Sequence, residues 1–348
     1  MMPEEWPIAA PAAGGNGPAR PAGRGRLATV RRDFFLNPAE RLTEQERALM
    51  TAMLHCLVSD VADSVRAALP SGRIAANDEG DAALVEMLMQ SGLIDEPGLM
   101  ALLLRRADEE RIATAARARS GRREARVLQG LVSHDYGAVA AAAMALILAR
   151  GRRRDRFGQC LIAFDDLPEA SAEHLVYAVA AGLRRELAGA RGPSSADSEL
   201  TQASENVIEA HDAERSMEAL TGALVHFLDE GGGLTDDLIL AAAQEGEVGF
   251  VAEVLARRGG ISSDSSMDEL LCGDSKRLMA VLRVAGASRE LSAGLLGGIG
   301  DLLGIAEAGE AIASFDRMSE DEVRAARSWL VTVPAYRAAL ERLGERRG

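Results

Sequence analysis

Aromatic residues make up only 3% of this 348-residue sequence, and it holds no alternating apolar run of useful length. Strands favour β-branched and aromatic residues, so this scarcity argues against a sheet. Apolar residues still make up 47% of the chain, which is enough to form a core. Short amphipathic segments, separated by Gly, Pro, Ser and Asp, follow one another from Thr43 to Leu343. The sequence therefore predicts an all-α fold.

Cysteine is also scarce, and the three cysteines are far apart: Cys56, Cys160 and Cys272. No CxxC pair is present, which excludes both a disulfide framework and a typical zinc site. Free thiols fit a reducing compartment, so we expect a cytoplasmic protein. The first residues include Glu4 and Glu5 and lead into no apolar segment, so we expect no secretory signal.

Long apolar runs are missing as well. The longest runs from Tyr136 to Ala149 and is mostly alanine. It is too short for a hydrocarbon layer of about 30 Å, so we expect no membrane span. An apolar run of this length is typical of a buried helix, and we expect it to lie at the centre of the fold.

Basic residues are fewer than acidic ones. The sequence contains 39 Lys and Arg and 53 Asp and Glu, which gives a net charge of -14. This balance disfavours nucleic acid and anionic membranes as partners. Lys276 is the one lysine, so nearly every cation is an arginine.

Composition divides the chain into four parts. Residues 1–28 are rich in Pro, Gly and Ala, which predicts a disordered tail. Residues 29–188 form an N-terminal helical region and residues 199–348 a C-terminal helical-repeat region. Between them, residues 189–198 (GARGPSSADS) have the composition of a linker.

The C-terminal region contains a weak internal repeat. GEVGFVAEVLARRGG, from Gly246, is similar to GDSKRLMAVLRVAGA, from Gly273, and an apolar helical segment precedes each copy. Each copy therefore reads as the second helix of a hairpin. Because one hairpin cannot bury its own apolar face, stacked hairpins are expected. The predicted architecture is a HEAT-like α-solenoid or an irregular helical bundle.

Recognisable catalytic chemistry is missing. The glycines of Gly297–Gly304 follow a helical segment rather than a strand, so they do not fit a dinucleotide loop. No two histidines have the i, i+4 spacing of a helical metal site, and no GxSxG is present. We expect the acidic pairs Asp165–Asp166 and Asp236–Asp237 to cap helices rather than to act as acid and base. No catalytic, metal or cofactor residues are predicted.

One basic zone remains, from Arg105 to Arg156. Between residues 101 and 160, thirteen arginines oppose six acidic residues, an excess of seven positive charges. Arginine suits bidentate contact with phosphate or carboxylate. The zone could bind an anion, or it could be an internal counterpart to the acidic second half of the chain or a solvated surface. The candidate anion-binding residues are Arg117, Arg119, Arg122, Arg123, Arg152, Arg153, Arg154 and Arg156.

Three stretches and the C-terminal end resemble a bacterial family of unknown function, numbered 2336. The stretches are Arg31–Pro70, which contains the most specific motif RLTEQERALM, Phe164–Leu187 and Leu234–Gly260; the end is SFDRMSEDEVRAARSWLVTVPAYRAAL. The resemblance implies an all-helical protein with HEAT-like repeat character. It supplies no catalytic residues.

These observations favour a non-enzymatic scaffold or adaptor that binds another protein, in bacterial signalling or regulation, because stacked helical pairs form extended binding surfaces. One alternative is a regulator that binds a nucleotide or nucleic acid through the Arg105–Arg156 zone, with nucleic acid the less favoured ligand. A second alternative is an enzyme whose helical active site carries no known motif.

Overall fold

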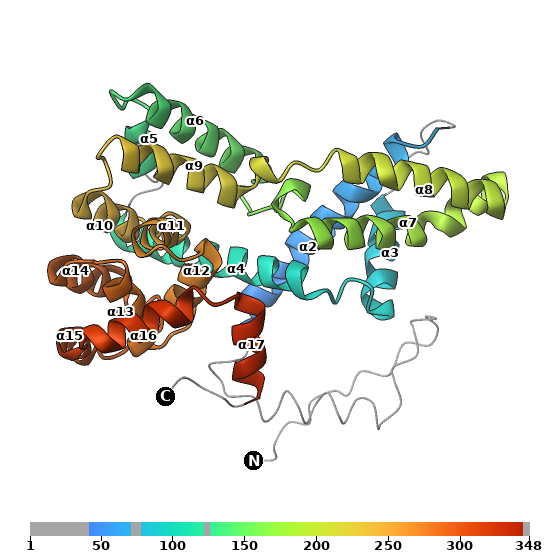
Figure 1. Ribbon diagram of the computed structural model, residues 1–348. Coiled ribbons are helices and arrows are strands. Elements are labelled where there is room, and N and C mark those ends of the chain that lie inside the picture. Colours follow the sequence, from blue (N-terminus) through green and yellow to red (C-terminus); the bar gives the residue numbers. More distant parts are fainter. Residues whose placement is uncertain (1–41, 71–77, 122–125, 344–348) are drawn as a thin grey trace, which may run out of the picture. The chain divides into compact units, whose positions relative to one another are not determined.

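The computed structural model describes residues 42–70, 78–121 and 126–343. Within these ranges the chain is helical and contains no strand, only an isolated β-bridge between Arg154 and Cys160. The predicted all-α fold is therefore confirmed (Figure 1). The predicted tail, residues 1–28, lies outside the described residues.

The described elements follow one another with short connections. The first half of the chain contains α2 (Glu44–Ala67), α3 (Asp78–Ser91), α4 (Pro97–Ser120), α5 (Arg126–Leu131), α6 (Gly137–Arg152), the 3-10 turn η2 (Phe164–Asp166), α7 (Glu169–Arg191) and α8 (Pro193–Glu209). The second half contains η3 (Ala213–Arg215), α9 (Met217–Glu230), α10 (Asp236–Gln244), α11 (Val248–Gly259), α12 (Ser263–Leu271), α13 (Ser275–Val284), α14 (Arg289–Ile299), α15 (Ala308–Arg317), α16 (Glu320–Leu330) and α17 (Pro334–Arg342).

Two hydrophobic cores hold these helices together. The first core is built by α2, α3, the first half of α4, α7 and α8. The second is built by the end of α4, by α5 and α6, and by helices from α9 to α16. The long helix α4 contributes to both, since Ala107 belongs to the first core and Ile112 to the second. Side chains from α4 are thus positioned where one core gives way to the other.

Helix α2 supplies a large part of the first core. By length and composition alone, it is the one helix among the described residues that could cross a membrane, with a hydropathy of 1.3 over its most apolar window. Its apolar stripe is buried against the neighbouring helices, including Met53, Leu57 and Val61 at no more than 1% exposure. A core helix gives the same signal as a membrane span, and this burial fits a core helix.

Residues 189–198, which we predicted to be a linker, lie at the corner between two helices. Helix α7 continues to Arg191, Gly192 turns the chain with φ +86°, and α8 begins at Pro193. Leu187 of α7 and Leu200 of α8 lie in the same core. Gly and Pro mark a tight helical corner as readily as a linker, so composition could not distinguish the two.

The internal repeat is a real feature of the helix pairs. Gly246 and Gly273, with φ near +78° and +70°, join α10 to α11 and α12 to α13. A Cβ at Gly246 would lie 2.6 Å from Cα of Ala113, so this turn also needs the close approach of α4. Gly304, with φ +82°, lies in a longer connection between α14 and α15, a third helix pair that the sequence comparison missed.

Helix α6 is not the buried central helix that its composition predicted. It packs against α5 and α9, and Val139, Ala143 and Leu146 are fully buried on that side. On the other side, Met144 and Leu148 are 43% and 55% exposed. The prediction failed because alanine-rich apolar helices are buried only where a second layer covers them.

Candidate functional site

A pocket of about 690 Å³ lies among α4, α5, α6, α9, α11 and α12. Charged side chains of both signs line it, together with a few apolar ones such as Ile147 and Met267. The charged members are Arg105, Arg106, Arg117, Arg150, Arg153, Arg154, Glu109, Glu110, Glu218, Glu247 and Glu253. Much of the predicted basic zone is therefore gathered around this pocket.

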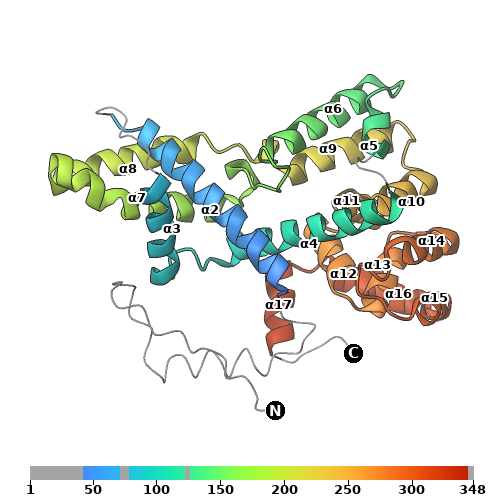
Figure 2. The same cartoon turned by 180° about the vertical axis from the view of Figure 1, so that it is seen from behind.

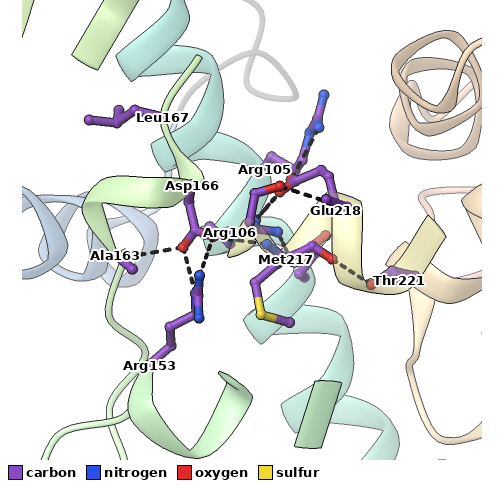
Figure 3. Close-up of polar contacts among 12 residues, drawn as sticks. Arg105, Arg106, Arg153, Ala163, Asp166, Leu167, Met217, Glu218 and Thr221 are labelled. Atoms are coloured by element: carbon purple, nitrogen blue, oxygen red, sulfur yellow. Dashed lines mark hydrogen bonds and ion pairs between the residues drawn. The ribbon is translucent and has the colours of Figure 1, made fainter. Parts of the chain in front are cut away.

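Arg106 lies at the inner end of this pocket and is only 6% exposed. Its guanidinium donates to both carboxylate oxygens of Glu218, at 2.8 and 2.7 Å, and to Glu109 at 2.7 Å (Figure 3). Burial alone lowers the pKa of Arg106, but the charges of Glu109, Glu218 and Asp166 outweigh it and raise the pKa. The side chain is therefore a permanent cation that fastens α4 to α9.

A second buried pair joins Arg153, at the end of α6, to Asp166 of η2. The two form a bidentate ion pair with N–O distances of 2.7 Å, and the Asp166 side chain has no exposed surface (Figure 3). The carboxylate also accepts hydrogen bonds from the backbone N–H groups of Ala163 and Met217, at 3.0 and 2.9 Å. One carboxylate thus holds the end of α6, the η2 turn and the start of α9 together.

Four hydrogen bonds and the nearby charges keep Asp166 ionised. Burial raises the pKa of Asp166, but the hydrogen bonds from Arg153, the charges of Arg106 and Arg153 and the Met217 N–H together lower it below the ordinary value. Asp165 and Asp166 do stand where a helical turn begins, because both lie in the first turn of η2 and Asp166 accepts from the N–H of its N-cap residue Ala163. They do not cap α7, which begins after Pro168 without a side-chain cap. By contrast, Asp236 and Asp237 stand in the first turn of α10, behind the N-cap Thr235.

Two further arginines connect the zone to the second half of the chain. Arg105 donates to Asp264 at 2.8 Å and also reaches Glu218. Arg150 pairs with Glu247, with N–O distances of 2.8 and 2.6 Å. We call Arg105, Arg106, Arg150, Arg153 and their carboxylate partners the ionic seam. Three of its acidic members, Glu218, Glu247 and Asp264, come from the second half of the chain, and the other two, Glu109 and Asp166, come from the first half.

The arginines predicted to bind an anion are divided by the structure. Arg117 and Arg154 both bond to Glu110 at 2.8 Å, and Arg119 pairs with Asp301. Arg153 belongs to the ionic seam, Arg152 is exposed, and Arg156 lies over the ring of Phe157 at 4.7 Å. Arg122 and Arg123 lie outside the described residues. These ion pairs favour the interpretation in which the arginines of the zone neutralise acidic residues of the same chain.

The chemistry available in the pocket is limited by these pairs. Cys160 is the one thiol in its lining. Burial, followed by the charge of Glu110, raises the pKa of Cys160 to about 11, so the thiol is protonated and a weak nucleophile at neutral pH. In the described part of the chain, no three His, Cys, Asp or Glu side chains are grouped so that they could hold a metal ion.

Sequence reasoning missed a second, more apolar site between α7 and the turn that follows α3. A groove of about 440 Å³ is lined there by Leu93, Ala170, Glu173, His174, Tyr177, Ala178 and Ala181. Leu93 and Tyr177 are 41% and 42% exposed, and His174 Nε2 lies 2.6 Å from the Leu93 carbonyl oxygen. One signal was available, since Tyr177 falls outside the inward stripe of α7 and therefore points an aromatic ring outward. We call this site the α3–α7 groove.

Comparison with known proteins gives a family but no activity. No curated protein and no solved structure matches the chain. A family model described as "Uncharacterised protein conserved in bacteria (DUF2336)" matches residues 82–328. The match contains Phe164–Leu187 and Leu234–Gly260, whereas Arg31–Pro70, which we expected to be the most specific stretch, lies outside it. Because the match covers more than half of the sequence, this chain belongs to the bacterial family DUF2336.

Proposed function

We propose that this chain is a non-enzymatic scaffold or adaptor in bacterial signalling or regulation, and that it binds a segment of another protein in the α3–α7 groove. The observation that carries the proposal is the groove itself, where apolar and aromatic side chains are exposed beside a few polar groups. Such a combination is typical of sites that hold a protein segment or a ligand. Tyrosine is also enriched among residues that dominate binding energy.

The charges near the groove favour a positively charged partner segment. Glu173 lines the groove, Glu169 lies one turn earlier on α7, and Asp95 follows Leu93 by two residues; all three are exposed. The whole chain is acidic as well, with a net charge of -14. A segment with apolar side chains on one helical face and Lys or Arg at its ends complements this surface. The acidic rim would repel nucleic acid.

The helix pairs from α10 to α15 support the adaptor role in a second way. Pairs of helices that pack on one another produce extended surfaces without a catalytic centre, and we propose that this part has HEAT-like character. The free thiols Cys56, Cys160 and Cys272 agree with the reducing cytoplasm, where we place the protein.

The two alternatives have less support. A regulator that binds an anion through the basic zone needs cations that are free for the ligand, and most described arginines of the zone already have a carboxylate partner. An enzyme needs a group of suitable pKa in a pocket, whereas the pKa of Cys160 is raised to about 11. Binding of nucleotides at low salt would revive the first alternative.

A peptide-display experiment tests the proposal. The immobilised full-length chain is used to select peptides from a random library, and the binders are measured against the wild type and the Tyr177→Glu variant. We expect enriched peptides with apolar residues three or four positions apart and with flanking Lys or Arg. The variant should bind them at least ten-fold more weakly, equivalent to about 1.4 kcal/mol.

Tyr336→Glu is the matched control, because Tyr336 of α17 is also an exposed tyrosine, at 58%. It should bind the selected peptides like the wild type. A selection that yields no binder sensitive to Tyr177→Glu, or binders that Tyr336→Glu weakens equally, would show that the groove is not the binding site.

A further inference from the structure

Helix α6 is apolar on both of its sides. From Gly137 to Ala149 it contains no charged or polar side chain. One side is buried through Val139, Ala143, Leu146 and Ala149, whereas the opposite side is formed by exposed residues. A helix at the surface of a protein normally presents polar and charged residues to water. The composition of the outer face of α6 therefore favours contact with another apolar surface over exposure to water.

The position of α6 leaves this outer face accessible. The helix packs on α5 and α9. Figures 1 and 2, seen from opposite sides, both show α6 beside α5 and α9, with no other described helix along its remaining side. Met144 and Leu148 are 43% and 55% exposed there, and Ala141 and Ala145 are exposed as well. Exposed apolar side chains arranged in one stripe mark an interaction surface.

We propose that this face binds the same face of a second copy of the chain, with the two α6 helices antiparallel. The outer residues, in order, are Gly137, Ala141, Met144, Ala145, Leu148, Gly151 and Arg152. Reversing this order about the midpoint between Met144 and Ala145 places Ala141 opposite Leu148 and Met144 opposite Ala145. Each large side chain then faces a small one, which lets two helices interdigitate closely. An isologous dimer requires such self-complementarity.

The charges at the two ends of α6 fit the same arrangement. Asp135 precedes the helix, Arg152 ends it, and both are exposed. In an antiparallel pair, Arg152 of each copy comes within about one turn of Asp135 of the other. Two such contacts of opposite charge form at once, together with antiparallel helix dipoles. In a parallel pair, by contrast, Asp135 would face Asp135 and Arg152 would face Arg152, so the charges select the antiparallel arrangement.

Exposed aromatic residues lie just beyond both ends of the helix. Tyr136 precedes α6 and is 42% exposed, and Phe157 follows it and is 75% exposed. The antiparallel arrangement brings the Tyr136 end of one copy to the Phe157 end of the other. Aromatic residues are typical of the centres of protein interfaces and supply large contact areas. This inference is independent of the α3–α7 groove, which involves other helices.

Sedimentation analysis of the full-length chain over a range of concentrations tests the proposal. We expect a reversible dimer for the wild type. Leu148→Glu and Met144→Glu should each raise its dissociation constant at least ten-fold. Leu104→Glu is the matched control, since Leu104 of α4 is 41% exposed and lies on another surface; it should leave the dimer intact. A wild type that stays monomeric at all concentrations, or a dimer that both α6 variants leave unchanged, overturns the proposal.

Charge reversal tests the antiparallel register. Asp135→Arg should weaken the dimer, and so should Arg152→Asp, because each places like charges together. The double variant should restore most of the wild-type dissociation constant, since the exchanged charges again face their opposites. If the double variant is as weak as the single variants combined, the register is wrong.

Discussion

The ionic seam and the outer face of α6 invert the usual arrangement of a protein. In the seam, charged side chains such as Arg106 and Asp166 are buried and paired with groups of opposite charge. On α6, apolar side chains such as Met144 and Leu148 are exposed. The difference indicates that the cluster of arginines in the sequence forms ion pairs within the chain, whereas the binding surface that we propose lies where apolar residues remain uncovered.

The largest expected effect comes from breaking the seam at its centre. Arg106→Met removes the cation and leaves Glu218 and Glu109 without their main buried partner. We expect a loss of about 3 kcal/mol in the free energy of unfolding, because three hydrogen bonds between charged groups are lost and two partly buried carboxylates lose their main cation. Denaturant unfolding followed by circular dichroism measures it. Arg119→Met on the same helix is the control, since Arg119 pairs with an exposed aspartate. If Arg106→Met lowered the free energy of unfolding as little as the control, the seam would not stabilise the fold.

Asp166 makes the seam sensitive to acid. Its pKa is below the ordinary value of 3.8 in the folded chain, so near and below that value the unfolded state binds more protons. The stabilising contribution is therefore complete above about pH 4–5 and is lost as the pH falls through the folded pKa. Each extra proton bound by the unfolded chain changes the free energy of unfolding by about 1.4 kcal/mol per pH unit.

Asp166→Asn tests this assignment. We expect a loss of about 2–3 kcal/mol at neutral pH, because asparagine has one acceptor oxygen in place of two, so two of the four N–H donors lose their acceptor and Arg153 loses its charged partner. The variant should also show a flatter fall in stability below pH 4 than the wild type. Urea denaturation at pH values between 3 and 7 provides both numbers, and parallel pH curves for the two proteins would remove Asp166 from the acid response.

The fold was predictable to the extent that it depends on local patterns. Helical periodicity, the two glycine turns at Gly246 and Gly273 and the scarcity of aromatic residues all act over short stretches, and the structure confirms the helices they predict. The third pair at Gly304 was missed because its connection to α15 has a different length. The predicted linker at residues 189–198 coincides with the corner between α7 and α8, because a helical corner and a linker use the same residues.

The site was predictable only in part, because it depends on contacts between distant residues. The sequence located the basic zone and allowed an internal role for it, but it could not say that Arg106 meets Glu218 or that Arg105 meets Asp264. It also could not show which side of α6 is covered, since both sides are apolar. The α3–α7 groove requires Leu93, which follows α3, to lie beside Tyr177, and no local pattern specifies that contact.

Substitutions on the outer face of α6 should affect association of two copies, whereas substitutions in the seam should affect the stability of the folded monomer. Leu148→Glu replaces a side chain that is 55% exposed, so the unfolding free energy of the isolated monomer should change by no more than about 0.5 kcal/mol. The wild-type unfolding midpoint should rise with protein concentration because association stabilises the folded state, and the midpoint of the variant should not. Thermal unfolding over a hundred-fold range of concentration distinguishes them. A large loss of monomer stability would mean that Leu148 belongs to the core.

The smallest effect is expected at the corner between α7 and α8, where Arg184 and Asp197 form a bidentate pair at 2.5 and 3.0 Å. Both side chains are about half exposed, at 51% and 52%. Water and salt screen such a pair, and holding two long side chains in place opposes it. Arg184→Ala should therefore leave the unfolding midpoint within experimental scatter, in low and in high salt alike. A clear loss at low salt that disappears at high salt would show that geometry alone, without burial, makes an arginine pair stabilising in this protein, and would weaken the distinction between the buried seam and the charged surface.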